Sequence, residues 1–392
     1  MRRTRALSDR LGLWIAVGLL LVACGEDAPA ADPTSASSGA GTTGTGGDGG
    51  AGGGGPTCPP GSHAAPDGGC EATLAEWSTG PSLAQRRDHH LTFVASSEAG
   101  PFIYAAGGVV DNGELLDSIE LAPIQPDGTL GPWSSASTLP EVIAGAAVAV
   151  VGTTVVMTGG YRMAAVSATL SKKTDVAVLG ADGTLQTWAA GPEMSLSRFH
   201  HAMVAHGDSL YVIGGLTGNN TDNTPKVERA MITGSDVAAW TEVTPLPGRR
   251  SHHSAATDET AIFVTGGLEG NPAGEYTSFG DVLRAQFLEE GGLGDWVKVG
   301  DLPTTLGTHS SFVHAGMLYV VGGIEGDSHN TAAVRRSPIG EDGTLGAWEE
   351  LPALPTARAH AHQSPLYQGF VYAVAGAYNH DSMADVFIGR FE

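Results

Sequence analysis

The 392-residue sequence has few positive charges, few aromatic side chains and only three cysteines. Lys and Arg total 20 against 42 Asp and Glu, and the formal net charge is −22. Nucleic acids and anionic lipids are bound through basic surfaces, so this balance argues against both as partners. Only 16% of the residues are charged and 41% are hydrophobic, which indicates a globular chain. We expect the acidity to serve solubility, with a cationic partner or Ca²⁺ as the alternative.

An apolar run at residues 11–23, LGLWIAVGLLLVA, is too short for a membrane span of about 20 residues. It follows the basic segment MRRTRALSDR and ends at Cys24. With Leu21, Val22 and Ala23 before the cysteine, the segment resembles a bacterial lipoprotein signal peptide over residues 1–23. The resemblance implies cleavage before Cys24, acylation of Cys24 and attachment to the outer membrane. The protein would face either the periplasm or the cell surface. An ordinary secretory signal is the alternative.

Residues 24–57 are rich in Gly, Ser and Thr and contain too few apolar side chains to build a core. We expect a flexible tether there, with the main domain at 74–392. Between them, residues 58–73 contain the close pair Cys58 and Cys70, which in an exported protein indicates a disulfide loop. A zinc site with His63 is the alternative, but it lacks a fourth ligand.

One pattern recurs six times in the main domain, and a tryptophan marks each copy. Leucine or methionine lies six positions after each tryptophan, and two apolar runs then lead to a glycine pair in five copies and to AGA in the last. Such regular self-similarity is typical of a repeat architecture. The repeat tryptophans are Trp77, Trp133, Trp188, Trp240, Trp296 and Trp348.

Each copy divides into four short strands separated by turn sequences such as PDGT, ADGT and EDGT. In the third copy the expected strands are HHAMVAH, SLYVIGG, VERAMI and AWTEV. Four strands and a glycine pair in each copy resemble the kelch repeat. The resemblance implies an all-β, six-bladed β-propeller. Because the chain enters at a fourth-strand position and leaves at a third, the strand around Trp77 is expected to close the last blade.

Connections between strands two and three and between strands four and one are expected on one face of the propeller. In kelch proteins that face commonly binds partners, and here its sequences are polar, which suits a protein or glycan ligand. Ordinary hydrophilic loop tips are the alternative. The candidate loop residues are Asn219, Asn220, Asp222, Asn271, Glu275, Tyr276, Asp327, His329, Asn330, Tyr378, Asn379, His380 and Asp381.

Arginine and histidine also recur, ten and twelve positions after the tryptophan in four copies. Adjacent strand residues point to opposite faces, so the pair His200–His201 is not expected to share a metal. The first histidine and the arginine of each copy are candidates for a cationic slot at the channel mouth that binds an acidic ligand. Packing within each blade is the alternative. The candidates are Arg87, His89, Arg198, His200, Arg250, His252, Arg358 and His360.

Motifs for catalysis are weak in this sequence. Copper-radical oxidases with a kelch-type propeller use a cysteine cross-linked to tyrosine, and no cysteine follows Cys70. No phosphate-binding loop or zinc-finger spacing is present, and we expect no metal, cofactor or catalytic residue. The sequence therefore predicts a membrane-anchored kelch binding protein of unknown oligomeric state. A sugar mutarotase or epimerase with a buried Glu/His pair at the channel mouth is one alternative, and a structural envelope protein is another.

Overall fold

The computed structural model describes residues 58–64, 69–111, 113–164, 167–218, 222–270, 276–326 and 329–392. Within these ranges the regular elements are all β-strands. The described part of the chain contains no helix long and apolar enough to cross a membrane. The predicted signal peptide, Cys24 and the tether lie outside the described residues.

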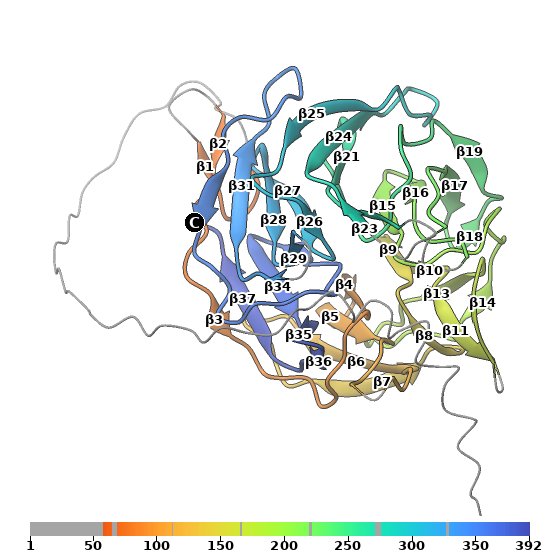
Figure 1. The fold of residues 1–392 in the computed structure, drawn as a ribbon. Coiled ribbons are helices and arrows are strands. Elements are labelled where there is room, and N and C mark those ends of the chain that lie inside the picture. Colours follow the sequence, from red (N-terminus) through yellow and green to blue (C-terminus); the bar gives the residue numbers. More distant parts are fainter. Residues whose placement is uncertain are drawn as a thin grey trace, which may run out of the picture.

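Six larger antiparallel sheets follow one another around a central axis in the described part of the chain, as the sequence colours in Figure 1 show. They form the blades of the β-propeller. Blade one contains β4 (Leu91–Ser97), β5 (Gly100–Ala106), β6 (Ser118–Pro123) and β7 (Ser134–Thr138). Blade two contains β9 (Ala147–Val151), β10 (Thr154–Thr158), β13 (Thr174–Val178) and β14 (Ala189–Ala190). Blade three contains β15 (Ala202–His206), β16 (Ser209–Ile213), β17 (Val227–Thr233), β18 (Asp236–Val237) and β19 (Thr241–Val243).

The remaining three blades keep the same order, and the last is completed from the N-terminal side of the sequence. Blade four contains β20 (Ser254–Thr257), β21 (Ala261–Thr265), β24 (Asp281–Gln286) and β25 (Val297–Asp301). Blade five contains β27 (Ser310–His314), β28 (Met317–Val321), β31 (Val334–Pro338) and β32 (Glu349–Leu351). Blade six contains β33 (Leu366–Tyr367), β34 (Phe370–Val374), β37 (Val386–Arg390) and β3 (Ser78–Thr79).

The second strand of each blade is buried on both faces because it lies between neighbouring blades. Every residue of β10, β16 and β21 is buried, which explains why these strands read as continuous apolar runs. Core clusters join adjacent blades, as where Val156 of blade two packs with Met203 and Val212 of blade three. Burial of this apolar surface stabilises the ring through contacts between blades as well as within them.

Closure by the strand after Trp77 is confirmed, because Ser78 pairs with Ile388 and Thr79 with Phe387. The joint also extends further upstream than expected. Leu74 forms a bridge with Phe391, and the Thr73 amide donates to the Glu392 carbonyl. Upstream of this joint, β1 (His63–Ala64) pairs with β2 (Cys70–Glu71), and the Cys58–Cys70 disulfide links the two ends of that segment.

The innermost strands β4, β9, β15, β20 and β27 adjoin in order around the channel. Blade six differs, because residues 361–365 form no strand and β33 has only two residues. In blade three the first strand was expected to begin at His200, but it begins at Ala202. His200 and His201 precede β15, since His200 has a φ of 50° that a regular strand does not allow.

Most connections between the second and third strands form small hairpins of their own, which the sequence analysis did not predict. Several also pair with the segment that precedes the first strand. The elements are β8 (Val142–Ala144) with β11 (Tyr161–Ala164) and β12 (Ser167–Leu170); β22 (Leu268–Gly270) with β23 (Tyr276–Ser278); β26 (Leu306–Gly307) with β29 (Ile324–Glu325) and β30 (His329–Asn330); and β35 (Ala377–Tyr378) with β36 (Asp381–Ser382).

Candidate functional site

A closed ring of backbone hydrogen bonds surrounds the channel, with one member from each blade. The amide of each member donates to the carbonyl of the member in the preceding blade, with N···O distances of 2.8–3.1 Å. In blade one, the preceding blade is blade six, so the ring closes. All six members have a left-handed backbone, with φ between 50° and 61°. The ring members are His89, Gly145, His200, His252, Thr308 and His360.

The left-handed backbone turns the amide and carbonyl of each ring member toward the neighbouring blades. For residues other than glycine this conformation is rare and unfavourable. The hydrogen bonds stabilise it, since each member both donates to one neighbour and accepts from the other. Gly145 shows that the position requires the backbone conformation and not a histidine side chain.

The imidazoles of the ring members gather in two stacked pairs. His89 and His360 have ring centroids 4.1 Å apart, and His200 and His252 have centroids 4.0 Å apart. Gly145 and Thr308 separate the two pairs around the ring. His89 and His200 connect the pairs through a tilted contact at 5.0 Å.

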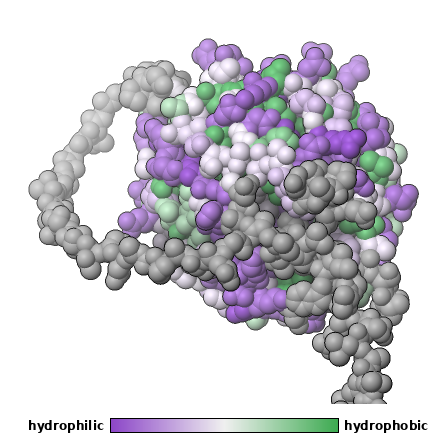
Figure 2. Space-filling model, viewed as in Figure 1, coloured by the Kyte–Doolittle hydropathy of each residue, from purple (hydrophilic) through white to green (hydrophobic). Residues whose placement is uncertain are grey.

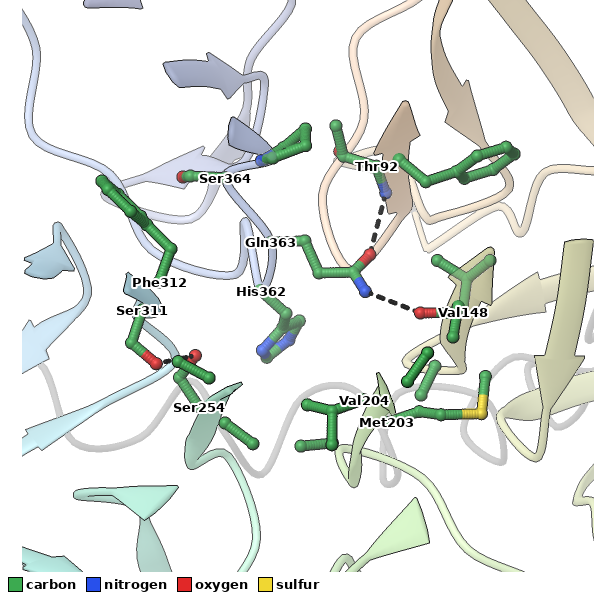
Figure 3. Close-up of a pocket in the computed structure, with 18 of the residues that line it drawn as sticks. Thr92, Val148, Met203, Val204, Ser254, Ser311, Phe312, His362, Gln363 and Ser364 are labelled. Carbon is green, nitrogen blue, oxygen red and sulfur yellow. Dashed lines mark hydrogen bonds between the residues drawn. The ribbon is translucent and has the colours of Figure 1, made fainter. Parts of the chain in front are cut away.

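Blade six adds a fifth imidazole, which the sequence analysis missed. His362 lies in the irregular segment before β33, and its ring centroid is 5.3 Å from that of His200 and 5.9 Å from that of His89. Gln363 holds this segment across the channel. It accepts a hydrogen bond from the Thr92 amide at 3.2 Å and donates to the Val148 carbonyl at 3.1 Å (Figure 3).

A cavity of about 380 Å³ lies along the channel next to this cluster. Inner strands of the blades line it, and Figure 3 shows the imidazole of His362 pointing toward its centre. His362 therefore lines the cavity and also contacts the imidazoles of His89 and His200.

The buried imidazoles of His200 and His252 do not contribute to a cationic slot, so that prediction is wrong for these two residues. Burial, followed by the neighbouring His252 and His89 rings, lowers the pKa of His200 well below its usual 6.5. Burial, followed by His362 and His89, does the same for the pKa of His252. Both side chains are therefore neutral at pH 7, and an acidic ligand would find no positive charge on them.

Three of these histidines bring ligand atoms close together, contrary to the expectation of no metal-binding set. Nitrogen atoms of His89, His200 and His362 all lie within 4.8 Å of one another. Nδ1 of His200 and Nε2 of His362 are buried without a hydrogen-bond partner. Nδ1 of His89 bonds instead to the Asp88 carboxylate, which leaves Nε2 of His89 as its other polar atom.

The repeated arginines do not line the channel mouth, so their assignment as ligand-binding residues is also wrong. Arg198 is fully buried and forms an ion pair with Glu228 of β17. Its Nη1 donates to the carbonyl of Gly214, the first glycine of the glycine pair, at 2.9 Å. Arg87, Arg250 and Arg358 form equivalent pairs with Glu120, Asp281 and Asp385.

Blade two provides the same kind of ion pair from a different place in the sequence. Ile143 stands where four of the other blades have arginine, and Arg162 of β11 takes the place of that arginine in space. Its Nε donates to the Gly159 carbonyl at 2.9 Å, and its Nη1 lies 2.5 Å from the Asp175 carboxylate. Each of these arginines therefore joins the end of strand two to strand three.

In blades three and five, the histidine directly after the ring member contacts the preceding blade. His201 is buried, and its Nε2 shares a hydrogen bond of 3.0 Å with Thr158 of blade two. His309 contacts Thr265 of blade four in the same way, at 2.7 Å. The adjacent histidines are thus separated as expected, although the left-handed residue and not strand alternation separates them.

The candidate loop residues lie on hairpins and turns and not in one pocket. Tyr276 is half-buried, while Asp222 and His329 are exposed. The β35–β36 turn presents four consecutive exposed side chains, Tyr378–Asp381. Asn219, Asn220, Asn271, Glu275 and Asp327 lie outside the described residues.

A model of the Kelch motif matches residues 197–228, which begin at the ring of blade three and end on β17. The chain therefore contains a kelch motif and is similar to kelch-repeat proteins. Kelch-like protein terF of Aspergillus terreus is 25% identical over 210 residues, and the match covers 48% of this chain and 42% of the relative. Human Kelch-like protein 34 is 28% identical over 194 residues, and the match covers 49% of this chain and 27% of that protein.

Among solved structures, that of YjhT aligns with a TM-score of 0.63 at 11% identity. The alignment covers 80% of this kelch chain and 99% of YjhT, so the two share a fold. The chain spans less than half the length of the two curated kelch relatives. Kelch repeats on a β-propeller suggest protein binding.

Proposed function

We propose that this kelch propeller is an exported, lipid-anchored binding protein whose protein ligand docks on the face built by the hairpins. The observation that carries this proposal is the β35–β36 hairpin. Its tip holds Tyr378, which is 42% exposed, followed by Asn379, His380 and Asp381, all exposed. Aromatic and hydrogen-bonding side chains on a rigid element are typical of recognition surfaces.

The backbone of this hairpin supports a role beyond chain reversal. Tyr378 pairs with Asp381, so the turn has two residues, Asn379 and His380, with φ of 46° and 71°. Glycine would adopt these conformations without steric strain, whereas a histidine there is unfavourable. A side chain that is kept at a strained position is a candidate for direct contact with a ligand.

Contact with the outer surface is favoured over entry into the channel at this face. His200 and His252 are 4% and 0% exposed, so the imidazole cluster fills the channel below the ring. Large exposed apolar side chains are few in the described residues, and Figure 2 shows hydrophilic, intermediate and hydrophobic groups intermixed on the coloured part of the face in view. A mixed polar surface of this kind suits a transient protein partner.

The docking proposal is tested by cross-linking in the source cells followed by mass spectrometry. The full chain is compared with a Tyr378→Ser/His380→Gly variant and with Leu288→Ser, a control at an exposed residue in a connection between strands three and four. A partner that is captured by the wild type and the control but not by the hairpin variant supports the proposal. Equal capture by all three chains contradicts it. A glycan array that retains the wild type but not the hairpin variant would identify a glycan ligand instead.

The anchor is tested separately by replacing Cys24. Metabolic labelling with a radioactive fatty acid should label the wild type and leave Cys24→Ala unlabelled. The variant should also leave the membrane fraction, since acyl chains are the proposed attachment. Equal labelling of both chains would reject the anchor without affecting the docking proposal.

A further inference from the structure

We propose that His89, His200 and His362 form a binding site for one divalent transition-metal ion, such as Zn²⁺, in the central channel. The exposed residues Tyr378–Asp381 of the proposed docking hairpin contribute no ligand atom to it. It combines three blades that are distant in the sequence, because blades one, three and six each supply one imidazole. Neutral imidazole nitrogens are preferred ligands of Zn²⁺, Cu²⁺ and Ni²⁺, but not of Ca²⁺ or Mg²⁺.

The distances fit a metal after a small rotation of the side chains. The ligand atoms lie within 4.8 Å of one another. Zn–N bonds of about 2.0–2.1 Å place two ligands of a tetrahedral ion about 3.4 Å apart. Rotation of the imidazoles has to close about 1.4 Å at most, and the nearby cavity leaves room for His362 to move.

In two of the three histidines, one ring nitrogen is not engaged in a hydrogen bond. Nδ1 of His200, in a side chain that is 4% exposed, and Nε2 of His362 have no hydrogen-bond partner. In a neutral imidazole one nitrogen carries no hydrogen and can coordinate a metal ion, and these two nitrogens form no competing hydrogen bond.

A carboxylate orients one of the three ligands. Asp88 accepts a hydrogen bond from Nδ1 of His89, and the Ser382 hydroxyl donates to the other oxygen of Asp88. Metal-binding histidines commonly donate their second N–H to a carboxylate in this way, which fixes the tautomer and directs the free nitrogen at the ion. Asp88 also places a negative charge next to the proposed dication.

The proposal is tested by titrating Zn²⁺ into the full chain, purified without a histidine tag, and measuring the heat of binding. Wild type should bind one equivalent, and Ca²⁺ should give no signal. His200→Gly and His362→Gln should each weaken Zn²⁺ binding by about 100-fold or more. Gly145 occupies the same ring position in blade two, so glycine at position 200 keeps the left-handed backbone.

Two controls distinguish this site from other histidines. His252→Gly changes the same ring position outside the triad, and His329→Ala removes an exposed histidine on β30. Both should bind Zn²⁺ within about threefold of wild type. If wild type binds no Zn²⁺, or the triad variants bind as tightly as wild type, the site does not exist. If His252→Gly is weakened as much as His200→Gly, the assignment of these three ligands is wrong.

Folding is checked by thermal melting of each chain with EDTA and with Zn²⁺. Zn²⁺ should raise the melting temperature of wild type and of the controls, because a ligand of the folded state stabilises it. The triad variants should melt cooperatively but show no rise. His200→Thr, which copies the residue that blade five has at this ring position, Thr308, replaces His200→Gly if the glycine chain is unfolded at the assay temperature. An equal rise in both sets contradicts the proposal.

Discussion

At the scale of single residues, the repeated arginines show how a regular spacing within one chain serves packing. Arg198 is fully buried, yet its charge is matched by Glu228 and its Nη1 also donates to the Gly214 carbonyl. Glu228 accepts a further hydrogen bond from the Ser195 amide at 2.8 Å. Removing one partner of such a pair leaves the other charge buried without compensation.

Replacing Arg198 should therefore destabilise the fold strongly. We expect Arg198→Met to lower the free energy of unfolding by about 3–5 kcal/mol, because Glu228 stays buried. Arg86→Met is the control, since the ion pair of Arg86 with Asp111 is exposed to solvent and contributes less than about 1 kcal/mol. Urea unfolding monitored by tryptophan fluorescence measures both. Similar losses in the two variants would show that burial of the pair has no special role.

Buried histidines make stability depend on pH. Burial lowers the pKa of His309 from 6.5 to about 3. Between these values the unfolded chain takes up a proton that the folded chain does not, so the free energy of unfolding decreases as the pH falls from 6.5 toward 3. His309→Gln removes this contribution and keeps a polar group near Thr265.

The wild type should lose more stability than His309→Gln on acidification, by about 1.4 kcal/mol for each pH unit between pH 6 and pH 4. Urea midpoints at pH 6, 5 and 4 measure the difference. His329→Gln, at an exposed position, should follow the wild type. Parallel curves for wild type and His309→Gln would mean that His309 is protonated in the folded chain.

At the scale of elements, the short strand β3 has an effect larger than its length. It pairs with β37, and the Nε1 of Trp77 beside it donates to the Pro352 carbonyl of blade five at 2.9 Å. Upstream, Ala72 and Leu74 are buried in the core shared by blades five and six. The segment from residue 72 to residue 80 thus covers an edge that a linear stack of blades would leave open.

A chain that begins at residue 58 should keep the melting temperature of the full chain, whereas one that begins at residue 81 should melt much lower or aggregate. The longer deletion exposes the edge of β37 and the apolar surface under Leu74. Calorimetry and size-exclusion chromatography measure the two outcomes. Equal stability of both chains would show that blade six is stable without β3.

At the scale of the whole molecule, side chains join each blade to its neighbour at regular intervals. Trp133, Trp240 and Trp296 donate from Nε1 to Pro81, Pro192 and Thr244, each carbonyl lying in the preceding blade. Tyrosines of the second strands bind in the other direction. Tyr211 donates to the Gly291 carbonyl in the turn of blade four, at 2.8 Å.

Loss of one tyrosine hydroxyl should weaken the ring by a modest amount. We expect Tyr211→Phe to lower the free energy of unfolding by about 1 kcal/mol, since the aromatic ring stays packed and only the hydrogen bond is lost. Tyr319→Phe is the control, because the Tyr319 hydroxyl lies next to Arg336 of its own blade and bonds to no carbonyl of the next blade. It should lose less stability than Tyr211→Phe. Equal losses in both variants would rule out a contribution of this bond between blades.

The sequence alone was sufficient for the blade pattern and for closure by the chain near Trp77. Tryptophans, glycine pairs and Asp-Gly turns act locally and repeat at a regular spacing, so their structural meaning can be inferred without distant contacts. The strand boundaries near the histidines were less accessible. Nothing in the residue types indicates that His200 adopts a left-handed backbone, because hydrogen bonds to two other blades stabilise that conformation.

Local patterns therefore determined the fold of this protein, while only the tertiary structure decided what its histidines and arginines do. Arg198 and His200 are two positions apart in the sequence, yet one is paired inside its blade and the other faces the axis. His362 looks unrelated to His89 in the sequence, and the irregular segment of blade six brings it within reach of that residue. Closing the ring brings imidazoles from distant repeats into one small volume. A local sequence pattern cannot predict this proximity, because the contacts join residues far apart in the sequence.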